Sequence, residues 1–509
     1  MSIRAKGPPF DGKGPGAATT QDAVVSCHRA SIAPASCQPP CLVGRLGDMR
    51  RLAASVATTI ATTVAATLVA ATPTFPAVTT HGSATWSDRR IAMQLVLAGI
   101  QMDHLSQALT WAKNGVGGIV LFGTPPKDLG AQLAQVRAAN PVPPFVSSDE
   151  EGGEVQRLSS LIYRLRSAEW MGAHRSVQQV RARAADYAPR MKALGVDMDL
   201  APDTDLLVPG HFISQVHRAF ASAPAAVGDY ANAWQRGMRS GHVVPVVKHW
   251  PGLGHSGNTD DSLQSTPPLR YMKAHDMRSF EATFAAHVPA AMVGNMVVPG
   301  LTETDKTPAS LSPAALHLLR KQGGDHLLII TDSLSAGAVR DGLGLSQAQA
   351  AVRALESGAD MALVDGVTPR SIADAIVAAL QSGHYARPAA MASVRRIMAA
   401  KRLTTPPDAP TAFTPADGAT GVARTVTLSV RTHDPLGGKD HVWFALRRHH
   451  STAWSAAPTA RVTVPAGTRA SYQPGHSLAS GAHYEWRVRS CNTARFCSAW
   501  STAHGFTTS

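Results

Sequence analysis

Short apolar runs alternate with longer amphipathic segments through the middle of the chain. The amphipathic segments place apolar residues at helical spacing and end at or just past a glycine, as at 225–241 and 346–360. The apolar runs lie at 117–123, 143–150, 195–205, 243–247, 289–299, 326–333 and 360–366. Short runs that alternate with helices predict repeated βα units around a parallel sheet.

Most of these apolar runs end in polar side chains. The residues concerned are Asp149, Glu150, Glu151, Asp203, Asp205, Asn295 and Asp332. Because the carboxyl ends of parallel strands meet at one edge, this pattern favours a (β/α)8 TIM-type barrel with its site on that face. An open doubly wound sheet would alternate in the same way, so periodicity alone leaves the closure of the sheet open. We expect the barrel to span residues 84–403.

The first part of the chain differs from the barrel in composition. Residues 1–48 are rich in Pro, Gly and Ser without apolar periodicity, which predicts a disordered or mispredicted leader. From Met49 a basic start, an apolar stretch and small residues follow, which predicts a secretory signal peptide over 49–77. A membrane anchor is the alternative. We therefore expect a secreted, extracellular or cell-wall-associated protein.

The last part of the chain changes to strand-like patterning. Residues 404–417 read as a Pro-rich linker, and alternating runs separated by turn residues follow at 425–430, 441–448, 460–464 and 483–490. This spacing predicts a small all-β sandwich over 418–509. Its closing strands resemble those of fibronectin type III-like modules, which implies a spacer or, less favoured, a carbohydrate-binding accessory. Cys491 and Cys497, a close pair in an exported domain, predict a disulfide.

The formal net charge of +13 changes the list of expected partners. A basic exported protein is attracted to anionic cell-wall polymers or membrane surfaces, although a basic surface can also serve solubility alone. The sequence has no compact basic cluster with interleaved aromatic residues. We therefore expect no nucleic-acid partner.

Six motifs in order carry a family resemblance. They are DEEGGEVQRL at 149–158, MDLAPDTDL at 198–206, HRAF at 217–220, KHWPGLG at 248–254, PASLSP at 308–313 and ITDSLSAGAV at 330–339. Together they resemble glycoside hydrolase family 3, most closely its bacterial β-N-acetylglucosaminidase (β-hexosaminidase) branch. The resemblance spans roughly Trp86 to Leu403.

The resemblance implies a catalytic nucleophile at Asp332. A retaining glycosidase needs a carboxylate that traps an oxocarbenium-like centre, and Asp332 matches the family nucleophile at the end of an apolar run. The following family Asp is Ser333 in this chain. The alternative for Asp332 is an ordinary helix N-cap after a strand.

The resemblance also implies a set of sugar contacts. Asp149 and Arg157 match the family's DxEGGxxxR motif, Arg218 matches its RSF-like motif, and Lys248 with His249 matches its KH pair. Carboxylates accept hydrogen bonds from sugar hydroxyls, and Lys and Arg donate to sugar oxygens. The alternative is a structural salt-bridge network at acidic strand ends.

The proton donor is where this chain departs from its relatives. The glucosaminidase branch carries an Asp-Ser-His triplet after the KH motif, whereas Leu263 stands here where that His would follow. Three readings remain open: His255 in the same loop donates the proton, Asp260 or Asp261 acts as a carboxylic acid with a raised pKa, or the site binds sugar with little turnover. We rank Asp260 just above His255.

The sequence thus predicts an exported retaining glycoside hydrolase. It would remove β-linked N-acetylglucosamine from peptidoglycan or chitin-like glycans, as a monomer and with no metal or organic cofactor. One alternative is a non-catalytic or weakly active glycan-binding protein. Another is a β-glucosidase, although such family members usually carry a second α/β domain that the predicted sandwich does not resemble.

Overall fold

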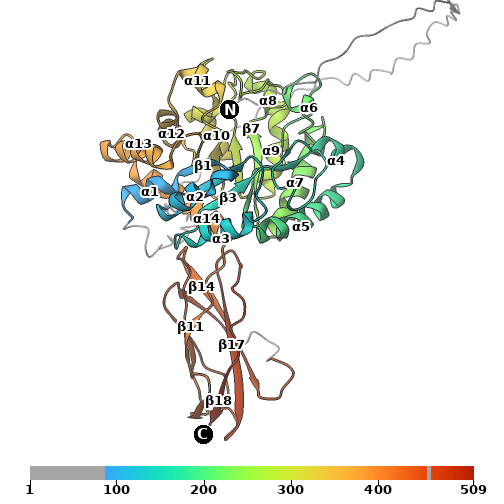
Figure 1. Ribbon diagram of the computed structural model, residues 1–509. Helices are drawn as coiled ribbons and strands as arrows, with labels where there is room; N and C mark the ends of the chain where they lie inside the picture. Colours follow the sequence, from blue (N-terminus) through green and yellow to red (C-terminus); the bar gives the residue numbers. More distant parts are fainter. Residues whose placement is uncertain (1–85, 455–459) are drawn as a thin grey trace, which may run out of the picture. The chain divides into compact units, whose positions relative to one another are not determined.

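The computed structural model describes residues 86–454 and 460–509 (Figure 1). The expected leader (1–48) and signal peptide (49–77) lie outside the described residues. Across the described part of the chain, no helix combines the length and the apolar character needed to cross a bilayer.

Eight parallel strands form the first sheet, and neighbours in the sheet follow the order of the chain. They are β1 (Val96–Gln101), β2 (Gly118–Phe122), β3 (Phe145–Ser148), β6 (Met198–Asp199), β7 (Val244–Trp250), β8 (Ala290–Val293), β9 (Leu328–Thr331) and β10 (Ala362–Val364). Strand β10 pairs with β1, and an isolated parallel bridge from Ile330 to Met361 joins β9 to the start of β10. The sheet therefore closes on itself.

This order confirms the barrel and excludes the doubly wound alternative, in which the strand order reverses at a switch point. Seven of the strands fall on the apolar runs of the sequence. The eighth, β1, was missed because it ends at Gln101 and carries no acidic residue that would mark its carboxyl end.

Helices surround the strands (Figure 1). They are α1 (Asp88–Gln94), α2 (Leu105–Lys113), α3 (Leu129–Ala138), α4 (Ala168–His174), α5 (Val177–Ala193), α6 (Phe212–Gln215), α7 (Pro224–Ser240), α8 (Leu269–Ala274), α9 (Asp276–Ala285), α10 (Pro313–Gly323), α11 (Gly337–Leu343), α12 (Gln347–Ser357), α13 (Pro369–Ser382) and α14 (Arg387–Lys401). Two 3-10 turns, Met102–His104 and Ala309–Leu311, complete the set.

Local sequence explains where several of these helices begin and end. Helices α5 and α12 each start with a capping box, in which Ser176 pairs with Gln179 and Ser346 with Gln349. Each such cap contributes about 1 kcal/mol by satisfying free backbone N–H groups. Helix α7 has Pro224 in its first turn and stops at Gly241, close to the limits expected from its apolar spacing.

The C-terminal part of the chain forms two further sheets around one apolar core. The first has the order β11-β13-β16 and the second β12-β18-β17-β14-β15. Their strands are β11 (Thr411–Thr414), β12 (Ala419–Val422), β13 (Leu428–Arg431), β14 (Lys439–Arg448), β15 (Ala460–Pro465), β16 (Arg469–Tyr472), β17 (His483–Cys491) and β18 (His504–Thr508). Buried Trp486, Phe444 and Phe506 belong to the shared core.

Two details of this region bear on the sequence-based expectations. The Cys491–Cys497 disulfide is present. Residues Thr411–Thr414, inside the segment expected as a linker, instead form strand β11, which pairs with β13. The Phe413 ring stacks on His504 at 3.9 Å and lies 5.3 Å from the Trp486 ring, so an apolar side chain anchors this segment in the sandwich despite its flanking prolines.

Candidate active site

A pocket of about 290 Å³ opens among the carboxyl ends of the barrel strands. It brings together seven of the eight predicted site residues, namely Asp149, Arg157, Arg218, Lys248, His249, Asp260 and Asp332. The eighth, His255, is not among the lining residues. Side chains from loops far apart in the chain thus meet in one cavity, as the strand-end pattern predicted.

Lys248, the fifth residue of β7, is buried at the base of this pocket. Its Nζ atom lies 2.8 Å from Asp149 Oδ1 and 2.6 Å from Glu151 Oε1. Burial alone would raise the pKa of both carboxyls, but the neighbouring cations outweigh it. The pKa of Asp149 is lowered, and that of Glu151 falls to about 2. Both side chains are therefore anionic hydrogen-bond acceptors at neutral pH.

Arg218 joins the same network from the loop that follows β6. Its Nε and NH2 atoms donate to the two carboxylate oxygens of Glu151 at 2.7 and 2.9 Å, a bidentate arrangement. Its Nε atom also lies 3.1 Å from Asp203 Oδ2. Although burial disfavours the cation, the surrounding carboxylates raise the pKa of Arg218 well above its ordinary value.

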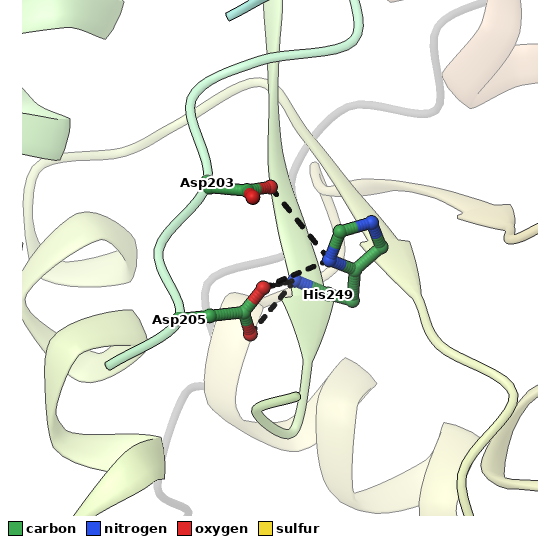
Figure 2. Close-up of side chains that lie close together, drawn as sticks. All are labelled: Asp203, Asp205 and His249. Carbon is green, nitrogen blue, oxygen red and sulfur yellow. Dashed lines mark hydrogen bonds and ion pairs between the residues drawn. The ribbon is translucent and has the colours of Figure 1, made fainter. Parts of the chain in front are cut away.

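His249 is held by two aspartates from the loop after β6 (Figure 2). Its Nδ1 atom lies 2.8 Å from Asp205 Oδ2 and 3.7 Å from Asp203 Oδ1. Burial lowers the pKa of His249, but Asp203 and Asp205 overcome it and the net shift is upward. Nε2, the second ring nitrogen, lies 3.4 Å from Arg218 NH2. Asp205 thereby fixes the orientation of the imidazole, since it also accepts from the His249 and Leu253 amides.

Asp203, Asp205 and His249 are also the group in the described residues whose geometry could hold a metal ion, with ligand atoms within 4.8 Å of one another. A cation there would compete with the Arg218 guanidinium for Asp203 and with the proton on His249 Nδ1 for the ring nitrogen. The raised pKa of His249 favours the protonated ring, which cannot ligate a metal. The donor set thus fits ion pairing better than metal binding.

Arg157 contributes a free donor to the pocket. Its NH2 group lies 3.7 Å from Asp149 Oδ2, and its guanidinium lies over the Phe122 ring at 5.8 Å. Its Nε–H is buried without a hydrogen-bond partner among the described residues. A buried unpaired donor is costly, so this N–H is a ready contact for a ligand oxygen.

Asp332 lies directly after β9, on the strand-end loop of the pocket. Its backbone N–H donates to the Val293 carbonyl at 2.8 Å, and its Oδ1 atom accepts from the Ser333 N–H at 2.8 Å. The Ser333 carbonyl is in turn held by Asn295 Nδ2 at 2.7 Å. The backbone around Asp332 is thus fixed while its carboxylate faces the cavity.

Asp260 reaches the same cavity from the loop after β7. Asn258 accepts from the Asp260 N–H at 3.1 Å and donates to Asp261 Oδ2 at 2.9 Å, which fixes the turn of the GNTD sequence. The carbonyls of Thr259 and Asp260 accept from the first amides of the α11 segment at 3.0 and 2.8 Å. The loop that carries Asp260 is thereby joined to the segment that follows Asp332.

The pKa of Asp260 is raised to about 6. The largest cause is burial of the carboxyl group, which removes water from its charged form, and the next is the negative charge of Asp332. The positive charges of His249 and Arg218 act in the opposite direction and lower this pKa. Asp260 as a whole is nevertheless exposed at the rim of the pocket, so only its carboxyl group is partly shielded from water. It can therefore carry a proton near neutral pH and exchange it with water.

His255 is turned away from this chemistry. Its Nδ1 atom lies 2.9 Å from Asp276 Oδ2, and its Nε2 atom lies 3.1 Å from the Tyr271 hydroxyl. Both ring nitrogens are engaged outside the pocket, so the geometry places Asp260 rather than His255 beside Asp332.

Several residues in or next to the pocket have no role assigned from the sequence. Glu151, Asp203 and Asp205 were recognised as polar strand-end residues, but their mutual pairing through Arg218 and His249 was not foreseen. The sequence did not mark Asn258 and Phe122 as pocket residues, because an amide in a loop and an aromatic residue at a strand end are common in any barrel.

The family model for the glycosyl hydrolase family 3 N-terminal domain matches residues 88–400. The chain belongs to glycoside hydrolase family 3. This region coincides with the described barrel, from α1 to α14.

Similar proteins within the family indicate the branch to which the chain is related. It is 35% identical over 329 residues to the β-hexosaminidase LpqI of Mycobacterium tuberculosis, which covers 62% of this chain and 84% of that protein. A family 3 glycosyl hydrolase structure from Mycobacterium smegmatis is similar, with a TM-score of 0.58, 35% identity, and coverage of 62% of this chain and 98% of that one. A Paenibacillus family 3 β-N-acetylglucosaminidase structure gives a TM-score of 0.59 and 27% identity, covering 63% of each chain. The chain is a β-hexosaminidase-like glycoside hydrolase.

Proposed function

We propose that this protein is a retaining β-N-acetylglucosaminidase in which Asp332 is the nucleophile and Asp260 is the acid/base. The observation that carries the proposal is that one pocket contains a fixed strand-end carboxylate, Asp332, and a second carboxyl, Asp260, whose pKa is raised to about 6. Two carboxyl groups in different environments are what retaining glycoside hydrolysis requires.

The chemistry proceeds in two displacements. Protonated Asp260 donates to the leaving glycosidic oxygen while an Asp332 oxygen attacks the anomeric carbon, giving a glycosyl-Asp332 intermediate and a free aglycone. Asp260, now a carboxylate, takes a proton from water as the water oxygen attacks that carbon and releases Asp332. The exposed rim position of Asp260 suits it to exchange protons with solvent.

The ion network at the base of the pocket holds the sugar. Asp149 accepts from sugar hydroxyls because Lys248 and Arg157 keep it ionised. The free Nε–H of Arg157 and the Nε2 side of His249 donate to sugar oxygens. Similarity to the β-hexosaminidases supports N-acetylglucosamine as the bound sugar.

Peptidoglycan or chitin-like glycans are the proposed substrates, and export is the proposed destination. The Cys491–Cys497 disulfide supports export because such bonds persist in oxidising compartments. The C-terminal sandwich is proposed to be a fibronectin type III-like spacer, since its large aromatic residue Trp486 lies in the core.

Hydrolysis of an aryl N-acetyl-β-glucosaminide, compared with the matching aryl β-glucoside, tests the proposal. We expect release from the first substrate and little from the second. Asp332→Asn should abolish turnover while sugar binding persists. In the parent enzyme, a slow 5-fluoro glycoside should trap the glycosyl intermediate, and mass spectrometry should find the label on Asp332. Wild-type rates in Asp332→Asn would refute the assigned nucleophile, and preference for the glucoside would refute the assigned substrate.

A further inference from the structure

A second and larger pocket, of about 720 Å³, lies outside the active site, between α4, α5 and the loop that precedes α4. Its lining has an apolar floor and a basic rim. The floor is made by the buried side chains Leu165, Met171 and Val180. The rim, which we call the arginine groove, is formed by Arg164, Arg166, Arg175 and Arg183.

Positive charge dominates this groove because four arginines line it, whereas Asp186 is the acidic residue among its described lining. Within residues 86–454 and 460–509, none of these four arginines forms an ion pair with a carboxylate. Asp186, the acid in the described lining, already accepts from the Tyr163 hydroxyl at 2.7 Å and from Arg190 at 3.1 Å. These hydrogen bonds, and also the charge of Arg183, lower the pKa of the Asp186 carboxyl, so a net positive charge remains on the four exposed guanidinium groups of the groove.

Aromatic rings hold three of these four arginines in place. The guanidinium carbons of Arg166 and Arg175 lie 5.2 and 5.0 Å from the Trp170 ring, and that of Arg183 lies 5.4 Å from the Tyr163 ring. Cation–π contacts orient a guanidinium without neutralising its charge. The arginines are thus preorganised for an anion rather than paired within the fold.

The arginine groove is connected to the active site through shared backbone contacts. The hairpin of β4 (Glu150–Gly152) and β5 (Val155–Gln156) lines the sugar pocket with Glu154 and Val155. At the same hairpin, the Gly153 carbonyl accepts from Arg164 NH2 at 3.2 Å. On the other side, Glu169 of α4 donates its N–H to the His217 carbonyl, next to Arg218.

We propose that the arginine groove binds the phosphate or carboxylate groups of an anionic glycan polymer and so retains the enzyme on that polymer beside its active site. An apolar floor suits the apolar faces of sugar rings, and fixed guanidinium groups suit oxyanions. This function goes beyond the hydrolysis proposed above, which needs only the sugar in the 290 Å³ pocket.

The other polyanionic partners fit the groove less well. Single-stranded nucleic acids gain much of their affinity by stacking bases on free aromatic faces. Trp170 is already stacked on His174 at 4.6 Å and covered by two arginines. A membrane surface is broad and flat, and its headgroups reach the rim of a concave pocket but not its apolar floor.

Binding of labelled polymers to the full chain tests this inference. Asp332→Asn serves as the background so that no probe is cleaved. The probes are poly(glycerol phosphate), polygalacturonate and neutral chitohexaose, which separate phosphate from carboxylate recognition. The Arg164→Gln, Arg166→Gln, Arg175→Gln, Arg183→Gln variant should lose at least about tenfold in affinity for one of the polyanions, because four exposed charge contacts are removed together.

A matched variant controls for net charge. Arg236→Gln, Arg278→Gln, Arg370→Gln, Arg395→Gln removes the same charge from exposed helix positions outside the groove and should retain the affinity. Arg→Lys at the four groove positions, which keeps the charge, should retain part of the binding and checks that the fold survives. When the four groove substitutions are made in the active enzyme, which keeps Asp332, hydrolysis of a neutral aryl substrate should match that of the parent.

Three results would overturn the inference. These are equal loss of affinity in the groove and control variants, absence of polyanion binding by the parent, and tighter binding of an oligodeoxynucleotide of equal charge than of either glycan. Failure of the proposed hydrolysis would be recognised separately, since it affects the aryl substrates and leaves polymer binding intact.

Discussion

The backbone N–H of Gly337 donates to the carbonyl oxygen of Asp260 at 2.8 Å, and this bond joins the loop of the proposed acid/base to the segment that follows the proposed nucleophile. The approach is possible because residue 337 has no side chain. A Cβ atom there would overlap the Asp261 carbonyl and lie 2.9 Å from the Asp260 oxygen. The positions of Asp260 and Asp332 are therefore coupled through a single glycine.

Gly337→Ala should lower kcat more than it changes KM. The added methyl forces the 258–261 loop away, and a displacement of about 1 Å in a catalytic group can cost on the order of a hundredfold in rate. Steady-state kinetics on an aryl N-acetyl-β-glucosaminide would measure it. Alanine is the better helix former by up to about 1 kcal/mol, so helix propensity alone would predict a more stable protein with unchanged turnover.

Gly475→Ala is the matched control for this substitution. A Cβ atom at residue 475 meets nothing within 4 Å, and the residue is exposed in the C-terminal sandwich. Both kinetic constants should stay at their parent values. An unchanged kcat in Gly337→Ala would mean that the loop tolerates the displacement and that its position is not limiting.

Asp260 should set the alkaline limb of the pH profile. With a pKa of about 6 in the free enzyme, its acid form is lost as the pH rises, so kcat/KM should fall above about pH 6. Asp260→Ala should remove this limb on substrates with good leaving groups. External azide should restore turnover in that variant by attacking the glycosyl intermediate. His255→Ala should keep the limb, and its loss there instead would transfer the role to His255.

The sequence predicted which strand-end residues the fold would bring into one pocket, whereas it left the choice between loop residues open. Asp149 and Asp332 directly follow strands β3 and β9, and Lys248 lies near the end of β7. Parallel strands place their carboxyl ends together whatever the loops do. The choice between Asp260 and His255 depends on partners distant in the sequence. The ion pair between His255 and Asp276, which holds His255 outside the pocket, forms only in the folded chain and leaves no pattern in the sequence.

The arginine groove could not be predicted from the sequence for a related reason. Its four arginines are spread over residues 164–183 and are not contiguous in the sequence, so no compact basic motif is visible. The fold brings the loop before α4, helix α4 and the start of α5 around one pocket floor. The composition gives the net positive charge of the chain but not where on the surface that charge lies.

Arg157→Lys should raise KM while changing kcat little. Lysine keeps the charge near Asp149 but lacks the buried Nε–H that is free in the pocket. Loss of one hydrogen bond to a charged donor costs about 1.5–3 kcal/mol, or roughly ten- to a hundredfold in KM if the contact is made equally in the ground and transition states. A fall in kcat at constant KM would place the contact in the transition state alone.

Glu151→Gln should change how the stability of the protein depends on pH. Arg218 and Lys248 lower the folded-state pKa of Glu151 from 4.5 to about 2, so the free energy that this carboxylate contributes is fully present above pH 4.5. That contribution is lost as the pH falls towards 2, because the unfolded chain binds the proton first. Urea unfolding from pH 7 to pH 2 should therefore show a shallower acid slope in Glu151→Gln and a lower stability at pH 7. Glu154→Gln removes an exposed carboxylate of the same pocket and should keep the parent slope. Equal slopes in the parent and Glu151→Gln would mean that the ion pairs with Arg218 and Lys248 do not favour the ionised form of Glu151.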